Sequence, residues 1–141
     1  MFKFDIHFCG QVPPQKDYTE MTLDQIYEYI HWDATITIEL NNQLFFSAEI
    51  AIIEFYWYLT NWVKVDPFSN KDPFVYSTIE HTKPVLTFFA KDNGCWEIDS
   101  IWKKKDRPIL VEERMFFAEV YRLVDKLASY VQKKTGGGLL S

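Results

Sequence analysis

The sequence has few of the residues that build disulfide frameworks and metal sites. Among 141 residues it holds only two cysteines, Cys9 and Cys95, and three histidines, His7, His31 and His81. No pair of them stands at the spacing that zinc sites use. Two distant cysteines with no signal peptide ahead of them are typical of free thiols in a reducing compartment. We therefore expect no disulfide, no metal site and no cofactor.

Glycine is also scarce. Five glycines occur, at Gly10, at Gly94 and in the terminal stretch "TGGGLLS". They form neither a phosphate-binding loop nor a nucleophile elbow, so no catalytic residue is assigned. The length fits one domain. We expect a single α+β domain over residues 1–134 and a flexible tail over residues 135–141, of the kind that cloning can add.

No apolar run is long enough to cross a membrane. The longest, "SAEIAIIEFYWYLTNWVK", is interrupted by Glu49, Glu54 and Asn61, whereas a membrane helix needs about 20 predominantly apolar residues. The beginning, "MFKFDIHFCG", lacks the basic and then apolar regions of a secretory signal. We expect a cytoplasmic protein that has no membrane partner.

Aromatic residues, by contrast, are abundant. They make up 18% of the chain, with twelve Phe, eight Tyr and five Trp. Large rings bury much apolar area each, so they can fill the core of a protein of this size. Tyr and Trp also anchor protein interfaces when they stay exposed. The composition therefore fits either a well-filled core or a binding surface.

The protein is acidic, with a formal net charge of −5. The most acidic segment contains no Lys or Arg and holds the carboxylates Asp17, Glu20, Asp24, Glu28 and Asp33. An acidic surface repels nucleic acid and attracts basic partners. The alternative is a solvated face that supports solubility. We expect a basic protein partner and no nucleic-acid partner.

Alternating hydrophobicity predicts strands in both halves of the chain. "FKFDIHF" and "ATITIEL" alternate strictly, as half-buried strands do. Asn41-Asn42 predicts a two-residue hairpin turn that leads to the return strand "QLFF". "FVYSTIE", "VLTFFA" and "CWEIDSIW" predict further strands, and Asn93-Gly94 predicts the hairpin between the last two.

Helices are expected between and after these strands. Thr22 as N-cap, with Gln25 three residues later, predicts a short helix. Ser47 as N-cap predicts a long helix over residues 47–64, followed by a loop. The last helix, over residues 111–134, is amphipathic, and its buried stripe is Phe116, Val120, Leu123, Leu127 and Val131. This order predicts an α+β fold: an antiparallel sheet of about five to six strands, with a long central helix and a C-terminal amphipathic helix packed mainly on one face.

The expected helix 47–64 would have two apolar faces. Phe55 lies on the core-facing stripe, whereas Ile50, Ile53 and Trp57 gather on the far side of an ideal helix. A globular helix needs only one apolar face, so something must bury the second. Either another segment of the chain covers it, or it is an exposed patch that binds a partner, with Trp57 as the anchor.

Several stretches follow a hairpin in a fixed order: "LFFSAEIAIIEFYWYL", "FVYSTIE", "PVLTFFA", "WEIDSIW" and a closing helix. In this order, and in its aromatic placement, the chain resembles small, poorly characterised bacterial α+β proteins of the immunity or inhibitor type. The resemblance covers most of the chain. It implies a bacterial or phage protein that inhibits another protein, and no functional residue is carried over from it.

Because no reaction motif is present, we expect a binding module rather than an enzyme. The first hypothesis is an inhibitor of immunity or anti-defence type that blocks its target protein by stoichiometric binding. Its partner-binding residues would be Ile50, Ile53, Trp57, Asp17, Glu20, Asp24, Glu28 and Asp33. The alternative is a small-molecule-binding protein or enzyme with an aromatic-lined pocket between sheet and helices, where His31, Asp33 or Glu97 make polar contacts. A homodimer that buries the second helix face against itself is a third alternative.

Overall fold

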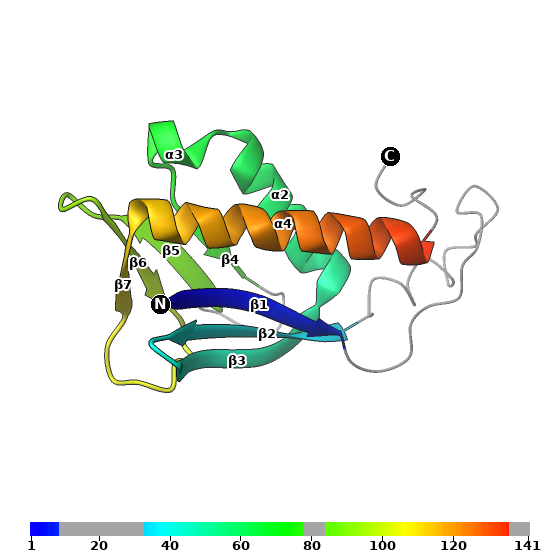
Figure 1. Ribbon diagram of the computed structural model, residues 1–141, viewed down its shortest axis with the longest axis horizontal. Coiled ribbons are helices and arrows are strands. Elements are labelled where there is room, and N and C mark those ends of the chain that lie inside the picture. Colours follow the sequence, from blue (N-terminus) through cyan, green and yellow to red (C-terminus); the bar gives the residue numbers. More distant parts are fainter. Residues whose placement is uncertain (9–32, 78–83, 136–141) are drawn as a thin grey trace.

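The computed structural model describes residues 1–8, 33–77 and 84–135 of the protein (Figure 1). The strands are β1 (Phe2–Phe8), β2 (Asp33–Leu40), β3 (Gln43–Ala51), β4 (Phe74–Tyr76), β5 (Leu86–Ala90), β6 (Cys95–Asp99) and β7 (Ile109–Glu112). The helices are α2 (Ile52–Lys64), α3 (Pro67–Asn70) and α4 (Glu113–Thr135). The expected α+β class is confirmed. The short helix predicted from Thr22 lies outside the described residues.

The described strands form two sheets, which corrects the prediction of a single sheet of about five to six strands. β1, β2 and β3 make a three-stranded sheet in that order, and β4, β5, β6 and β7 make a four-stranded sheet in that order. Every pair is antiparallel. Alternation shows that a segment is a strand, but it carries no information about which strands pair. Helix α2 stands between the two groups of strands in the chain.

The first sheet follows the predicted alternation. The residues of β1 and β2 that face the core are buried: Phe2, Phe4, Ile6, Ala34, Ile36 and Ile38. Asn41 and Asn42 form the turn to β3, with φ angles of 53° and 65°. Left-handed angles at both central residues are those of the type I′ turn, whose twist matches a hairpin. The two strands and the two-residue turn are therefore confirmed.

The long helix begins later than predicted. Residues 47–51 continue β3 and pair with β2, with Ser47 opposite Thr37 and Ile50 opposite Ala34. The helix starts only at Ile52, and no side chain caps its first turn. The helix propensity of a short segment is a weak effect, and the extended hairpin ladder outweighs it here. Ile50 is therefore a strand residue, which corrects its assignment to a helix face.

A bulge interrupts the pairing of β2 with β3. The register shifts after Ile38, which pairs with Phe46, and Phe45 is left as the extra residue. A bulge sets two residues against one and bends the strand. Accordingly, Phe45 and Phe46 are both buried although they are neighbours. The carbonyl of Phe45 accepts a hydrogen bond from the N–H of Lys104 at 2.7 Å, which ties the loop before β7 to the first sheet.

Two segments of the second half also differ from the prediction. The expected loop after α2 contains the short helix α3. Ile109–Glu112, expected as loop and as the first turn of the last helix, forms the edge strand β7. Its residues Ile109 and Val111 pair with Ile98 and Trp96 of β6. Their side chains complete the core-facing side of the second sheet. This segment is therefore more stable as a strand than as the first turn of the last helix.

Aromatic rings fill the space between the second sheet and the helices. The ring of Trp62 on α2 lies 5.7 Å from that of Phe88 on β5 and 5.8 Å from that of Trp96 on β6. Trp96 in turn stacks on Phe116 of α4 at 5.3 Å. Stacked and edge contacts add to the stabilisation that area burial provides. The predicted stripe of the last helix is confirmed at four buried residues: Phe116, Val120, Leu123 and Leu127.

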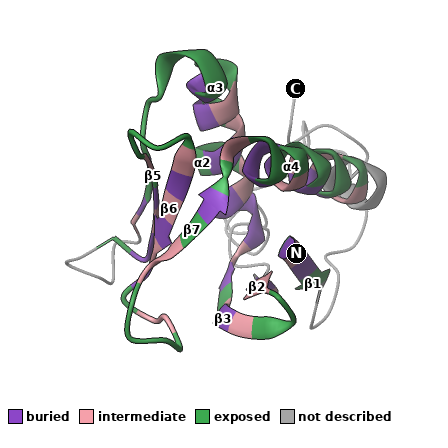
Figure 2. Cartoon of the chain, turned by 60° about the vertical axis from the view of Figure 1, so that its left-hand side comes forward, coloured by how far each residue is buried: buried purple, intermediate pink, exposed green. Residues whose placement is uncertain are grey.

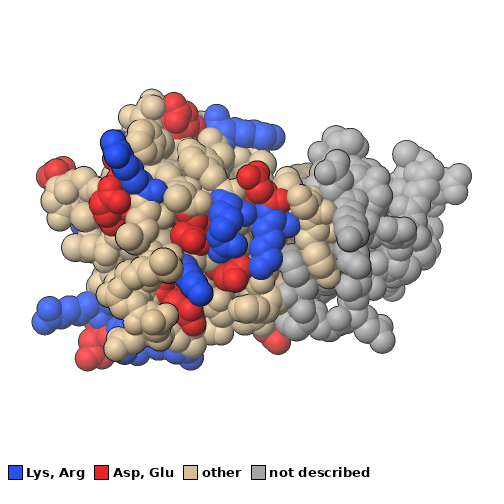
Figure 3. Space-filling model, in the orientation of Figure 1, with Lys and Arg blue, Asp and Glu red and all other residues tan. Residues whose placement is uncertain are grey.

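Helix α4 runs along β1 and covers this one of the two edges of the first sheet (Figure 1). The N–H of Phe4 donates to Glu119 at 3.4 Å, and its carbonyl accepts from Arg122 at 2.8 Å. Lys126 donates to the carbonyl of Ile6 at 3.3 Å. These side chains satisfy edge groups that could otherwise pair with a foreign strand. Figure 3 shows acidic and basic side chains intermixed on this side of the molecule.

Candidate protein-binding surface

The predicted helix face is not a continuous exposed patch. Ile50 on β3 and Ile53 on α2 are only 5% and 6% exposed, and both belong to the core. Trp57 alone remains on the surface, at 55% exposure. The two isoleucines are therefore corrected from binding residues to core residues, because the helix starts after Ile50 and Ile53 packs inward.

The predicted acidic segment lies almost entirely outside the described residues. This holds for Asp17, Glu20, Asp24 and Glu28. Asp33 is the first residue of β2, where its backbone pairs with Ala51 of β3. The part of these carboxylates in binding therefore stays a prediction.

The second sheet carries apolar side chains on both of its faces. One face packs into the core through buried residues, among them Phe74, Phe88, Trp96 and Ile98. On the other face Val75, Phe89 and Leu110 are 41%, 40% and 50% exposed. Successive side chains of a strand point to opposite faces, so these three belong to one surface. We call it the outer sheet face, made of Val75, Thr87, Phe89, Cys95, Glu97, Asp99, Leu110 and Glu112.

The strand register brings the outer side chains into rows. Phe89 of β5 pairs with Glu97 of β6, which pairs with Leu110 of β7. Val75 of β4 starts a neighbouring row through Thr87 of β5. Paired strands lie about 4.8 Å apart, so the members of a row are close neighbours on the surface. The apolar side chains are therefore gathered over one sheet rather than scattered singly.

No described helix covers this face. In Figure 2 the helices α2 and α4 lie on one side of β5, β6 and β7, and within the described part of the chain only loops lie on the other side. The helices pack on the core-facing side, as the contacts of Trp62 and Phe116 with Phe88 show. Antiparallel sheets often leave one face to water, but that face is then mostly polar. Large exposed apolar residues on it are typical of a binding surface.

Charged groups lie between and beside the apolar ones. Lys91 pairs with Glu97 at 3.4 Å, and Lys103 pairs with Asp99 at 3.1 Å. The carboxylate of Glu112 accepts hydrogen bonds from the backbone N–H groups of Arg114 and Met115, in the first turn of α4. Glu112 therefore caps this helix. The outer sheet face thus carries three carboxylates, of which Glu97 lies between Phe89 and Leu110, and two bordering ammonium groups.

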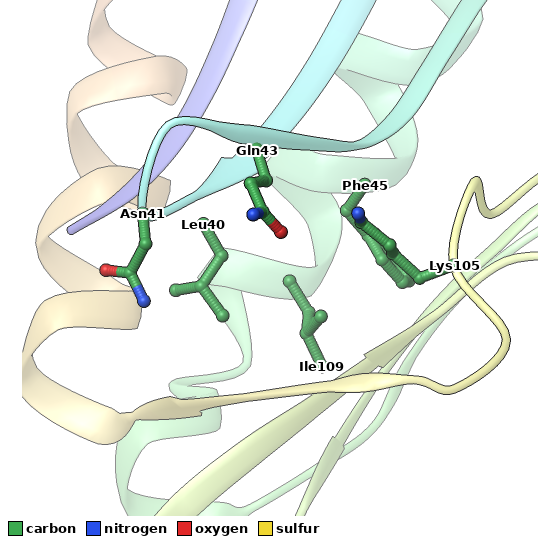
Figure 4. Close-up of a pocket in the computed structure, with 6 residues that line it drawn as sticks. All are labelled: Leu40, Asn41, Gln43, Phe45, Lys105 and Ile109. Atoms are coloured by element: carbon green, nitrogen blue, oxygen red, sulfur yellow. The ribbon is translucent and has the colours of Figure 1, made fainter.

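A groove opens between the two sheets, with a volume of about 240 Å³. It is lined by Leu40, Asn41, Gln43, Phe45, Lys105 and Ile109. Figure 4 shows Leu40 and Ile109 facing each other across it, and Gln43 directed into it from the start of β3. Phe45 reaches the groove because of the bulge, since it is the residue of β3 that has no partner in β2.

The pocket that the alternative hypothesis predicts between sheet and helices is occupied by rings. Phe55, Trp62, Phe74, Phe88 and Phe116 contact one another there. Glu97, one of the polar residues expected in such a pocket, lies on the outer sheet face instead. His31 lies outside the described residues.

The carboxylate of Glu113 accepts hydrogen bonds from two side chains that are distant in the sequence. The hydrogen bond from Lys71 lowers the pKa of Glu113, burial acts against it, and the indole N–H of Trp96 adds a second hydrogen bond that lowers it further. These contacts link the end of α3, strand β6 and α4, so the role of Glu113 is structural.

Among the described residues no group of three His, Cys, Asp or Glu could hold a metal ion, and Cys95 is a free thiol. None of the described helices is long and apolar enough to cross a membrane.

The outer sheet face was not predicted from the sequence, although the alternation of side chains that indicates it is present. The segments "FVY", "LTFFA", "CWEID" and "ILVE" alternate, and reading both faces of each gives Val75, Phe89 and Leu110 on the outer one. Without the strand order their proximity could not be seen.

Comparison with known proteins gives one family match: the description Domain of unknown function (DUF7878) fits residues 2–133. No curated protein and no solved structure matches the chain.

Proposed function

Since the chain belongs to the family described as Domain of unknown function (DUF7878), whose description names no activity, we propose a function from its surface: a protein-binding module that inhibits its target by stoichiometric binding. The setting is the cytoplasm of a bacterium, in an immunity or anti-defence role. The observation that carries the proposal is the outer sheet face, with Val75, Phe89 and Leu110 each at least 40% exposed.

The chemistry of this face suits a protein partner. A ring such as Phe89 gains most when a partner buries it in a pocket, and surrounding contacts exclude water from it. Val75 lies on the neighbouring strand, diagonally beside Phe89, and Leu110 lies two strands away, beyond Glu97 in the row of Phe89. The face is one side of a four-stranded sheet, and no described helix covers it (Figure 2). A protein surface is the occupant whose shape matches it.

The charges favour a basic partner. The outer sheet face has one more carboxylate than ammonium group: its carboxylates belong to Glu97, Asp99 and Glu112, and the bordering ammonium groups to Lys91 and Lys103. The formal net charge of the whole protein is −5. Carboxylates on a binding surface speed the encounter with a positively charged partner and disfavour acidic competitors. The acidic segment 17–33 would act in the same direction. Affinity would come mainly from the apolar residues, and the carboxylates would set specificity.

The proposal is tested by capture followed by a pair of matched variants. The tagged protein is used to recover partners from a lysate of the organism that produces it, and the dissociation constant of the recovered pair is then measured by calorimetry. Phe89→Glu and Trp57→Glu each place a carboxylate on a half-exposed aromatic position. They lie on opposite sides of the second sheet, because α2 packs on its core-facing side. Circular dichroism checks that both variants are folded.

We expect a one-to-one complex that Phe89→Glu weakens by about thirtyfold or more, as for a central interface residue. Trp57→Glu should leave the dissociation constant within about twofold, the effect of a surface residue outside the interface. Loss of binding in Trp57→Glu alone would move the interface to α2. If no partner is recovered and light scattering shows a dimer that Phe89→Glu dissociates, the face binds a second copy, and the inhibitor proposal fails.

A further inference from the structure

The groove between the two sheets is separate from the outer sheet face. Ile109 and Leu110 are neighbours in β7, but Ile109 lines the groove, whereas Leu110 is exposed on the opposite face of the sheet. A molecule in the groove therefore does not compete for the surface that we propose for the protein partner. We propose that the groove binds a small monocarboxylate with a short apolar body.

Polar groups at the groove can receive a carboxylate. The ammonium group of Lys105 has no carboxylate within ion-pair distance among the described residues. The side-chain amide of Gln43 points into the groove (Figure 4) and makes no hydrogen bond within that part of the chain. Asn41 uses its Oδ1 for the Met1 nitrogen, and its Nδ2 is left to donate. In Figure 4 Asn41 and Lys105 stand at opposite ends of the groove, so the cation of Lys105 and the amide of Gln43 are the groups that can hold a carboxylate.

The remaining walls are apolar. Leu40 and Ile109 face each other across the groove (Figure 4), and Phe45 closes the side formed by β3. Phe45 is only 1% exposed, and Leu40 and Ile109 pack against the core, so these walls are held in place. Ligand sites typically combine such apolar walls with a few polar groups that fix orientation. The apolar walls exclude a fully hydrated inorganic ion as the preferred occupant.

Size and charge limit the ligand further. The volume of about 240 Å³ lies below the range of about 300–1,000 Å³ that holds drug-sized ligands. A single lysine matches the single charge of a carboxylate, whereas phosphate sites gather several cations or a run of backbone N–H groups. The ligand is therefore a short aliphatic or aromatic acid, with its carboxylate at Lys105 and its apolar body between Leu40 and Ile109.

The test is a titration of the isolated protein with hexanoate, followed through the methyl resonances of Leu40 and Ile109. Hexan-1-ol is the probe with a body of similar length but no charge, and inorganic phosphate is the probe with charge but no apolar body. Lys105→Gln removes the proposed cation. Lys104→Gln is the matched control, because that neighbouring side chain is exposed and does not line the groove. Both positions are on the surface, so both variants keep the fold.

Hexanoate should shift both methyl resonances in the millimolar range, and Lys105→Gln should weaken its binding by about tenfold, as for the loss of a charge-assisted hydrogen bond. Lys104→Gln should change it by less than about twofold. Absence of a shift, equal binding of hexan-1-ol, displacement of hexanoate by phosphate, or equal effects of the two lysine variants would each overturn the proposal. No partner protein is present in this titration, so its outcome is independent of the proposed inhibitor function.

Discussion

Arg122 on α4 donates a hydrogen bond of 2.8 Å to the backbone carbonyl of Phe4 on β1. The two residues are 118 positions apart in the chain, and their contact covers the β1 edge of the first sheet. The same guanidinium pairs with Glu119 at 2.7 Å, and Glu119 accepts from the N–H of Phe4. One helix thus offers both an acceptor and a donor to one residue of this edge.

Replacing Arg122 by Ala should destabilise the protein modestly. The variant loses a charge-assisted hydrogen bond to a backbone carbonyl, and since the side chain is 45% exposed, we expect a loss of about 1 kcal/mol in the free energy of unfolding. Urea denaturation measures it. Arg114→Ala is the control, because that exposed side chain makes no ion pair among the described residues, and its effect should be within about 0.5 kcal/mol. Equal effects would show that the edge contact contributes nothing.

The adjacent residues Phe88 and Phe89 should respond in opposite ways to truncation. Phe88 is fully buried and contacts Phe4, Phe74 and Trp62, so Phe88→Ala should cost about 3–5 kcal/mol of unfolding free energy. Phe89 is 40% exposed on the other face, so Phe89→Ala should cost less than about 1 kcal/mol. Both are measured by urea denaturation. Similar losses in the two variants would contradict the orientation of β5.

Asp5 should contribute to acid sensitivity. Burial raises the pKa of Asp5, but the hydrogen bonds from Lys126 and from the N–H of Ile6, and the charges of Lys126 and Arg122, outweigh it and hold that pKa below its ordinary value. A carboxyl whose pKa is lowered by folding stabilises the fold above its unfolded pKa, about 3.9, and this contribution disappears as the pH falls through the folded pKa.

The free energy of unfolding should therefore decrease as the pH is lowered below about 4, and Asp5→Asn should make this decrease smaller. The measurement is urea denaturation over a series of pH values. Asp125→Asn serves as the control, because that exposed carboxylate on α4 has no ion pair among the described residues. A pH profile of Asp5→Asn that runs parallel to the wild-type profile would contradict the account.

The turn between β2 and β3 should discriminate between side chains at Asn42. Its φ of 65° lies in the left-handed region, which costs an ordinary L-residue about 1–2 kcal/mol, whereas Gly adopts it freely. Asn42→Gly should preserve or raise the thermal midpoint, since Asn-Gly is a favoured type I′ pair. Asn42→Val should lower it clearly, because a branched side chain fits this region poorly. Calorimetry compares them, and the reverse order would refute the turn assignment.

The sequence predicted the elements whose local signals agree with their surroundings. The alternation in "FKFDIHF" and "ATITIEL" and the stripe from Phe116 to Leu127 each state which face is buried, and packing uses that face. The turn at Asn41-Asn42 was predictable for the same reason, since few residues tolerate its backbone angles. These signals are local and need no knowledge of the partner strand.

The errors arose where pairing across the chain decided the structure. Ser47 looked like an N-cap, but residues up to Ala51 stay in β3 because β2 offers them partners. Moving the helix start by five residues took Ile50 off the expected helix face and left Trp57 alone on the surface. Likewise, Val75, Phe89 and Leu110 become one surface only through the order β4-β5-β6-β7, which single segments do not encode.

Methyl cross-saturation in the complex with the recovered partner tests the central claim most directly. Irradiation of the partner should attenuate the methyl resonances of Val75 and Leu110 on the outer sheet face. Val65, which is 48% exposed directly after α2, should be unaffected and serves as the internal control. Attenuation at Val65 with no change at Val75 and Leu110 would contradict the account, because it would place the partner on the helical side of the fold.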